Sequence, residues 1–112
     1  MRQIINGVVF DTDAATLVET IKKVVYDRDH NKFFPSGHRD SNWYCELHIG
    51  LNGAWFVVQR VTRKPRLFGL LGGDEWWSEV IPVNADVAFN LLQQVNAIDS
   101  CRKWFPDRVA SA

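Results

Sequence analysis

Four cations lie close together in the middle of the chain, shortly before the aromatic pair Trp76-Trp77. They are Arg60, Arg63, Lys64 and Arg66. Cationic side chains neutralise phosphates, and aromatic side chains offer faces on which unpaired bases stack. The cluster therefore makes nucleic-acid binding one hypothesis for this protein. Thirteen Lys and Arg residues balance thirteen Asp and Glu residues, so no overall positive field adds to that hypothesis.

Three glycines in the same stretch suggest a phosphate-binding loop, but their spacing does not match one. A Walker loop ends in Gly-Lys-Ser/Thr after four intervening residues, and a dinucleotide-binding loop has Gly-x-Gly-x-x-Gly leading into a helix. Neither pattern occurs in residues 69–73, and the acidic Asp74 and Glu75 follow directly. We therefore expect no phosphate-binding loop here and no cofactor.

The connection between residues 63 and 74 is longer than the roughly two to five residues usual in a hairpin loop, and long loops are often functional. Its apolar tip, with arginine and tryptophan beside it, has the composition of a protein-interaction hot spot. The candidate protein-binding residues are Arg63, Arg66, Leu67, Phe68, Leu70, Leu71, Trp76 and Trp77. Composition leaves open a second arrangement, in which the same loop folds back and covers the sheet.

Three histidines and an aspartate are candidate metal ligands: His30, His38, Asp40 and His48. Their spacing matches neither a His-x-x-x-His pair on a helix nor a site built on Cys-x-x-Cys. The two cysteines, Cys45 and Cys101, are too few for a disulfide framework or a four-cysteine zinc site. We expect solvated histidines, free buried cysteines and no metal.

Nucleophilic catalysis needs a cysteine or serine within hydrogen-bond reach of a base. Cys45 and His48 are three residues apart on an expected strand, where odd and even positions point to opposite faces, so they cannot meet. No histidine lies near Cys101 in the sequence. The carboxylates between positions 27 and 40 lie among cations, which is typical of a solvated loop. We therefore expect a protein that is not an enzyme.

The composition is that of an ordinary globular protein, with 46% hydrophobic and 23% charged residues. A length of 112 residues suits one domain, residues 1–112, around one core. No apolar run approaches the roughly 18 residues of a membrane span, and the first residues lack the pattern of a secretion signal. We expect a cytoplasmic protein with no membrane partner.

The N-terminal part predicts a hairpin, a helix and a loop. Asn6-Gly7 between β-branched residues is a strong signal for a tight hairpin turn within residues 4–10. Apolar residues then recur every three or four positions after the capping segment Asp11-Thr12-Asp13, which predicts a helix over about 13–26. Charge and turn formers predict a long loop over residues 27–41.

The remaining elements are expected to be a hairpin with Asn52-Gly53 in its turn, a third strand that Pro82 stops, and two helices. Their ranges are 42–50, 54–62, 75–83, 84–97 and 99–105, with Asn84 capping the first helix. The order β-β-α-β-β-β-α implies an α+β fold, with an antiparallel sheet of about five strands and two main helices packed on one face.

Alternation along the strand at 42–50 divides its side chains between two faces. The face expected to enter the core carries Trp43, Cys45, Leu47 and Ile49. The opposite face carries Tyr44, Glu46 and His48, and we expect it to meet solvent.

The start of the chain, from Asn6-Gly7-Val8-Val9-Phe10 to Asp11-Thr12-Asp13-Ala14-Ala15, resembles that of many short proteins of phages and other mobile elements. Those proteins begin with Gly-x-x-Tyr/Phe-Asp-Thr-x-x-Ala and continue with a helix, an aromatic hairpin and a terminal helix after a stretch like Ile81-Pro82-Val83. The shared motif is a hairpin turn and a helix cap, so it transfers no catalytic residue.

The resemblance implies a small accessory protein in a bacterial host cell that binds a host protein or protein complex. An inhibitor of a host defence system, such as an anti-CRISPR protein, is the leading hypothesis. The alternative is a nucleic-acid-binding accessory protein that uses the cations at 60–66. A homodimer through the tryptophan-bearing strand is a further hypothesis, since an exposed strand edge invites pairing.

Overall fold

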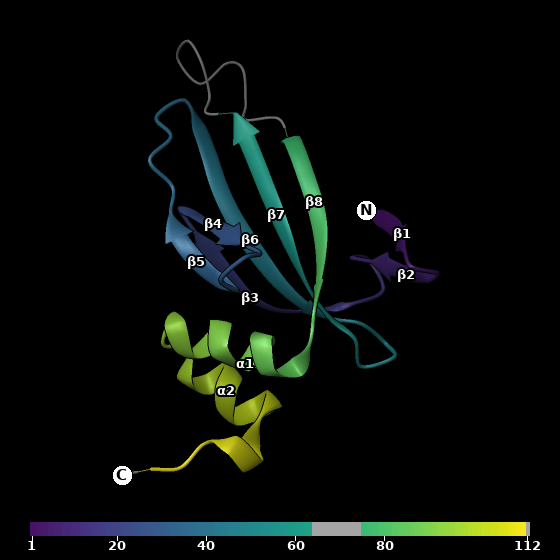
Figure 1. The fold of residues 1–112 in the computed structure, drawn as a ribbon, viewed down its shortest axis with the longest axis vertical. Helices are drawn as coiled ribbons and strands as arrows, with labels where there is room; N and C mark the ends of the chain where they lie inside the picture. Colours follow the sequence, from purple (N-terminus) through teal and green to yellow (C-terminus); the bar gives the residue numbers. More distant parts are fainter. Residues whose placement is uncertain (64–74, 112) are drawn as a thin grey trace.

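A computed structural model describes residues 1–63 and 75–111, in which eight strands and two helices are present (Figure 1). The strands are β1 (Arg2–Ile5), β2 (Val8–Asp11), β3 (Thr16–Lys22), β4 (Val24–Asp27), β5 (Lys32–Pro35), β6 (Ser41–Ile49), β7 (Trp55–Arg63) and β8 (Glu75–Val83). The helices are α1 (Ala85–Gln94) and α2 (Ile98–Trp104), followed by a 3₁₀ turn, Pro106–Arg108.

The strands form three antiparallel sheets within the described ranges. The largest has the order β3-β6-β7-β8, while β1 pairs only with β2 and β4 only with β5. Figure 1 shows the two small hairpins on opposite sides of the large sheet and the helices at one end of it. The molecule is therefore mostly β, and the prediction of an α+β fold with one five-stranded sheet is wrong.

The predicted helix over 13–26 is instead strands β3 and β4. Seven of the residues from 12 to 25 are β-branched, and such side chains favour strands over helices. A β-bulge between Leu17 and Glu19 shifts the register against β6, which breaks the simple alternation that would have revealed a strand. Lys23 then turns the chain, with a positive φ of 61°.

The predicted loop over 27–41 contains strand β5, so that prediction is also wrong in part. Asp27 Oδ1 accepts a hydrogen bond from the Asp29 backbone N–H at 2.8 Å, and Asn31 takes a positive φ of 50°. These two features close a tight turn between β4 and β5. Phe33 of β5 is buried and stacks edge-on against Tyr26 of β4.

The two faces of the large sheet carry different cores. One face packs against the β4–β5 hairpin and both helices, with Leu47, Val57 and Leu91 fully buried there. On the other face, Phe10 of the β1–β2 hairpin packs edge-on against Phe56, with ring centroids 5.3 Å apart. The small hairpins thus cover the large sheet from both sides.

A buried glutamine, Gln59 of β7, fastens the β4–β5 hairpin to the sheet. Its Oε1 accepts from the Tyr26 backbone N–H at 2.8 Å and from the Cys45 thiol at 3.1 Å. Its Nε2 donates to the backbone carbonyls of Val24 and Tyr44, at 3.3 and 3.0 Å. Every hydrogen-bonding group of this amide is used, so burial of Gln59 leaves none of them unpaired.

A second glutamine, Gln94 of α1, holds the outer strand of the same hairpin. Its Oε1 accepts from the Phe33 backbone N–H at 2.8 Å, and its Nε2 donates to the Phe33 carbonyl at 2.7 Å. The side-chain amide therefore replaces a neighbouring strand at this position of β5. Gln59 and Gln94 together fix the hairpin between the sheet and the helix.

Several expectations from the sequence are confirmed. Asn6 and Gly7 both have positive φ in the first hairpin, and Asn84 Oδ1 accepts from the Val87 backbone N–H at 2.8 Å to cap α1. The second hairpin, strand β8 and helix α2 lie within a residue or two of their predicted positions. No helix in the described part of the chain has the length and apolar character needed to cross a membrane.

The predicted faces of β6 are confirmed for Cys45 and Leu47, which are fully buried, while Trp43 and Ile49 are half-buried. His48 is an exception, because it was expected to meet solvent and is only 4% exposed. The His48 ring stacks on Phe56, with ring centroids 5.1 Å apart. Phe56 lies on the face of the sheet that the β1–β2 hairpin covers.

Candidate functional site

A hollow of about 680 Å³ lies where β3 stops beside β6. Cationic, aromatic and small polar residues line it, and we call it the basic pocket. Its lining consists of Thr20, Lys22, Lys23, Ser36, Gly37, His38, Arg39, Ser41, Asn42, Trp43, Tyr44 and Thr62. These residues come from β3 and the turn after it, from the start of β6, from the end of β7 and from the segment that follows β5.

The pocket exists because β3 is shorter than its neighbour. Lys22, the last residue of β3, pairs with Tyr44, so the first residues of β6 extend beyond the end of β3. The chain turns away at Lys23, forms the β4–β5 hairpin and returns through residues 36–40. The hairpin that Gln59 and Gln94 hold therefore places the second wall of the pocket.

Lys23 stands in a backbone conformation that favours glycine, with a φ of 61°. Its backbone N–H donates to the Trp43 carbonyl at 2.8 Å, and its carbonyl accepts from the Ser36 N–H at 3.0 Å. These two bonds hold the turn in place. A long side chain at such a position is uncommon, and conformational outliers of this kind concentrate at functional sites.

The charge of the lining is one-sided. Lys22, Lys23 and Arg39 are all exposed cations, and among the described lining residues there is no Asp or Glu. Asp40 follows Arg39 in the sequence but is not part of the lining. Cations gathered in a concave site attract anions more strongly than the same charges spread over a flat surface.

A row of aromatic rings begins in this pocket. The His38 ring stacks on Trp43, with centroids 4.6 Å apart and planes 16° from parallel. Trp43 Nε1 donates to Ser41 Oγ at 2.9 Å, and its ring lies 6.3 Å from that of Trp77 on β8. The hydrogen bond to Ser41 thus fixes the indole ring of Trp43, while His38, in an exposed segment, covers one face of that ring.

Of the four cations of the nucleic-acid hypothesis, Arg60 and Arg63 lie within the described residues, and Lys64 and Arg66 lie outside them. Arg60 Nε donates to Glu46 Oε1 at 2.8 Å, and the Arg60 side chain is only 14% exposed, so its first role is to pair that carboxylate within the sheet. Hydrogen bonds from His48 and from Arg60 hold the pKa of Glu46 below its ordinary value. Arg63 ends β7 opposite Ser41, at the edge of the pocket.

The candidate protein-binding residues are described only in part. Trp77 lies on β8 with 43% of its surface exposed, and Arg63 is exposed at the end of β7. Arg66, Leu67, Phe68, Leu70, Leu71 and the side chain of Trp76 lie outside the described residues. The prediction that this segment contacts a partner protein, and the alternative that it covers the sheet, both stay predictions.

The histidines weighed as metal ligands lie in three different places. His30 Nδ1 lies 2.8 Å from Asp27 Oδ2, His38 is on Trp43, and His48 is buried beside Glu46. No group of three or more potential metal-ligating side chains is found in the part of the chain that the structure describes.

Both cysteines are buried and free. Burial raises the pKa of the Cys45 thiol to about 12, and it raises the pKa of Cys101 as well. A thiol that keeps its proton at neutral pH is a poor nucleophile. The reading of both residues as structural cysteines fits this environment.

The residues that sequence reasoning missed are Lys22, Lys23 and Arg39. The adjacent lysines lie in the segment predicted to be a helix, and Arg39 lies in the segment predicted to be a loop. They meet because β3 ends, the chain reverses at Lys23 and the hairpin brings residue 39 back. The one signal in the sequence was a pair of lysines between two β-branched runs.

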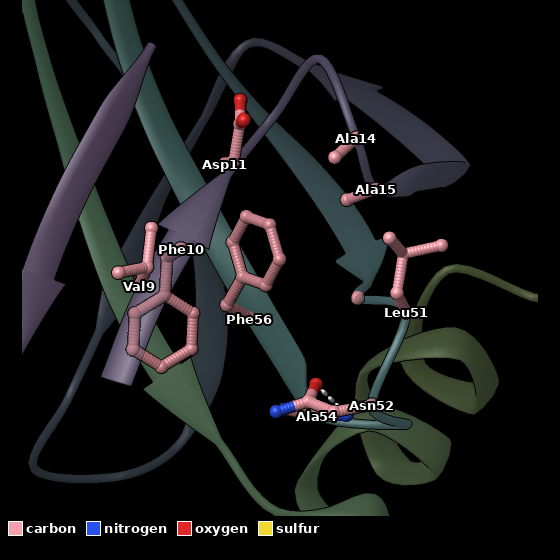
Figure 2. Close-up of a pocket in the computed structure, with 10 residues that line it drawn as sticks. Val9, Phe10, Asp11, Ala14, Ala15, Leu51, Asn52, Ala54 and Phe56 are labelled. Carbon is pink, nitrogen blue, oxygen red and sulfur yellow. Dashed lines mark hydrogen bonds between the residues drawn. The ribbon is translucent and has the colours of Figure 1, made fainter. Parts of the chain in front are cut away.

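A second hollow, of about 290 Å³, lies between the β1–β2 hairpin and the turn that joins β6 to β7. Figure 2 shows Phe10 and Phe56 on one side of it and Leu51 on the other. Its single carboxylate, Asp11, is engaged by Arg2 Nε at 3.2 Å and by the Asp13 N–H at 3.0 Å. This mostly apolar hollow offers little that would recognise a specific ligand.

Comparison with known proteins adds no relative. A scan against protein-family models finds no match, and neither do searches of curated proteins and of solved structures. The resemblance to short proteins of phages and mobile elements therefore stays a prediction.

Proposed function

We propose that this protein is a non-enzymatic binding protein that holds an anionic, phosphate-bearing ligand in the basic pocket. The observation that carries the proposal is the lining itself, in which Lys22, Lys23 and Arg39 share one hollow with no described carboxylate. The chain as a whole has no net charge, so this separation of charge is local.

The size and polarity of the pocket support a ligand of moderate size. Ligand sites commonly enclose about 300–1,000 Å³, and the basic pocket lies in that range. Ser36, Ser41 and Asn42 add hydroxyl and amide groups that can donate hydrogen bonds to phosphate oxygens. Among the described lining residues, no serine or threonine hydroxyl is hydrogen-bonded to a histidine, as an activated nucleophile would be.

Titration of the protein with inorganic tripolyphosphate by isothermal calorimetry tests this proposal. We expect binding that weakens as salt is raised, and a loss of about tenfold or more in affinity for Arg39→Glu and for Lys22→Glu, because each change replaces attraction by repulsion. Arg102→Glu is the matched control, since Arg102 is exposed on α2 and makes the same change in net charge away from the pocket. Equal affinities for all variants would rule the pocket out.

Protein recognition is the second candidate, and the exposure of Trp77 beside Trp43 favours it. Exposed tryptophan next to cations is typical of interface hot spots. The partner would be a bacterial host protein or complex, as for an inhibitor of a defence system. Purification from a bacterial lysate with wild-type protein and with a Phe68→Ala, Leu70→Ala, Leu71→Ala variant tests it. Equal recovery of every partner by both proteins would exclude residues 68–71 as the contact.

A homodimer is a separate form of that candidate. Strand β8 pairs only with β7 in the described part of the chain, so its outer edge has backbone groups that a second copy could pair with. Light scattering at several protein concentrations measures the oligomeric state directly. A constant monomer mass at high concentration would remove this form.

A further inference from the structure

We infer that the ligand of the basic pocket is a nucleotide unit of a single-stranded nucleic acid, with its base stacked on Trp43 in the place that the His38 ring occupies here. This inference rests on the proposed function, because it requires the same cations to hold the phosphate. It adds what the ligand must contain besides phosphate, namely an unpaired planar base.

The His38 and Trp43 rings stack face to face. The His38 and Trp43 rings are nearly parallel, at 16°, with centroids 4.6 Å apart. A base that stacks on a tryptophan adopts the same face-to-face arrangement. The histidine ring therefore marks a space of the right shape and orientation for a planar heterocycle.

The two stacked rings differ in how firmly the protein holds them. Trp43 is half-buried in β6, its Nε1 bonds Ser41, and its backbone carbonyl accepts from Lys23. His38 is exposed on a segment between strands, and its ring makes no hydrogen bond within the described residues. A base can replace His38 without disturbing the platform beneath it.

Cations lie in the same pocket as the Trp43 ring. Lys22, Lys23 and Arg39 line the same hollow as Trp43, so a phosphate can meet a cation while its base lies on the ring. Arg63 lies at the edge of the pocket, next to Thr62 and in register with Ser41, where a neighbouring phosphate of the same strand would pass. This arrangement of cations along an aromatic platform is typical of proteins that bind single strands.

The pocket suits a single strand better than a duplex. In a duplex both faces of each base are covered by its neighbours, so no face is available to a ring that lies within a pocket. An unpaired base is free to enter. Asn42, which lies in the lining, can also donate to and accept from the edge of such a base.

The experiment compares four probes by fluorescence anisotropy or competition at low salt: a 15-nucleotide oligothymidine, thymidine monophosphate, a 15-base-pair duplex and tripolyphosphate. We expect the oligonucleotide to bind most tightly, by about tenfold or more over each of the others. It should also quench tryptophan fluorescence, which tripolyphosphate should leave unchanged.

Variants of the stacked pair locate the base. Trp43→Leu should weaken oligonucleotide binding by about 5- to 100-fold, the loss of one stacked base, and weaken tripolyphosphate binding much less, because the cations of the pocket remain. Trp43→Phe should restore most of the loss because phenylalanine keeps an aromatic face. His38→Ala should bind the oligonucleotide as tightly as wild type or more tightly, since the competing ring is gone. Circular dichroism and thermal unfolding confirm that each variant is folded.

The outcomes distinguish this inference from the proposed function. If the oligonucleotide binds no better than tripolyphosphate and Trp43→Leu changes neither, the inference is wrong while the anion site stands. A preference for the duplex, or equal affinity for the mononucleotide, would also overturn it. If no probe binds at low salt, the proposed function and the inference both fail.

Discussion

At the scale of single residues, Lys23 connects the path of the chain to the chemistry of the pocket. Its positive φ turns the chain out of β3, and its side chain supplies one of the three cations. Glycine would make the same turn with less strain, because it has no Cβ. The lysine is thus explained better by what it offers a ligand than by what the backbone requires.

Lys23→Gly separates these two roles. We expect its free energy of unfolding to match or exceed that of wild type by up to about 1 kcal/mol, because glycine accepts a φ of 61°. Affinity for tripolyphosphate should nevertheless fall severalfold, since one cation is lost. Urea denaturation and calorimetry on the same preparation measure both quantities. A variant that is destabilised and still binds normally would contradict this assignment.

Cys45 gives a prediction about alkaline pH. Burial raises its pKa from 9.0 to about 12, so between these values the folded thiol keeps a proton that the unfolded thiol loses. The unfolded state is therefore favoured as pH rises through that window, and the stabilising contribution is fully present only below pH 9. Because Cys101 and Tyr26 also have raised pKa values, they act in the same direction.

Urea denaturation at pH 8, 9 and 10 measures this dependence. We expect the free energy of unfolding to fall with each step. Cys45→Ala should be less stable throughout because it leaves a cavity, but its stability should fall less steeply with pH. The slopes are the quantity to compare, and identical slopes would show that Cys45 does not contribute.

At the scale of elements, the β4–β5 hairpin determines whether the pocket has a second wall. Gln59 hydrogen-bonds this hairpin to the large sheet, and Gln94 of α1 hydrogen-bonds its outer strand. Arg28 in its turn also pairs with Glu79 of β8. The segment that carries His38 and Arg39 follows directly from β5, so its position depends on these attachments.

Gln59→Leu should detach the hairpin from the sheet. Leucine fills a similar volume but leaves the Tyr26 N–H and the Val24 carbonyl without partners, at a cost of about 2–4 kcal/mol. Ligand affinity should fall as well, although Gln59 does not line the pocket. Gln93→Leu is the control, because Gln93 is exposed on α1 and its loss should change stability by less than about 0.5 kcal/mol. Equal stability of the two variants would contradict the role of Gln59.

The elements that the sequence predicted well are those with strong local signals. Asn6-Gly7 and Asn52-Gly53 indicated two hairpins, and Asn84 marked the start of α1 by its side-chain cap. The segment from 16 to 27 had opposing signals, since helical spacing of apolar residues competed with its many β-branched residues. The bulge after Leu17 and the reversal at Lys23 interrupt the alternation of side chains that would have indicated strands here.

The candidate site was harder to predict than the elements, because its parts are distant in the sequence. Lys22 and Arg39 meet only after the β4–β5 hairpin has returned the chain, and that hairpin was not expected. Thr62 joins them through the pairing of β6 with β7. Because residues 13–26 were predicted to be a helix, the sequence did not predict the basic pocket.

At the scale of the whole molecule, the basic pocket is separate from the core that the β1–β2 hairpin forms on the large sheet. The helices pack on one face of the large sheet, and the β1–β2 hairpin packs on the other through Phe10 and Phe56. The basic pocket lies away from both, at the end of β3. Changes to the core between the β1–β2 hairpin and the large sheet should therefore alter stability without altering the basic pocket.

Phe10→Ala tests this separation. Removing a buried aromatic ring that packs against Phe56 should lower the free energy of unfolding by about 3–5 kcal/mol. The affinity of the folded protein for tripolyphosphate should stay within about twofold of wild type. None of the residues that line the basic pocket belongs to the apolar cluster around Phe10. Denaturation and calorimetry at low temperature measure the two effects. A parallel loss of affinity would show that the two regions are coupled.

The turn at Lys23 also has a consequence for how this chain can vary in evolution. Drift governed by folding alone would replace a residue with a φ of 61° by glycine or asparagine, which adopt that conformation most easily. Selection for an anion site would hold a lysine or arginine there in spite of the strain. The residue at position 23 in homologous sequences therefore indicates whether selection has kept an anion site there.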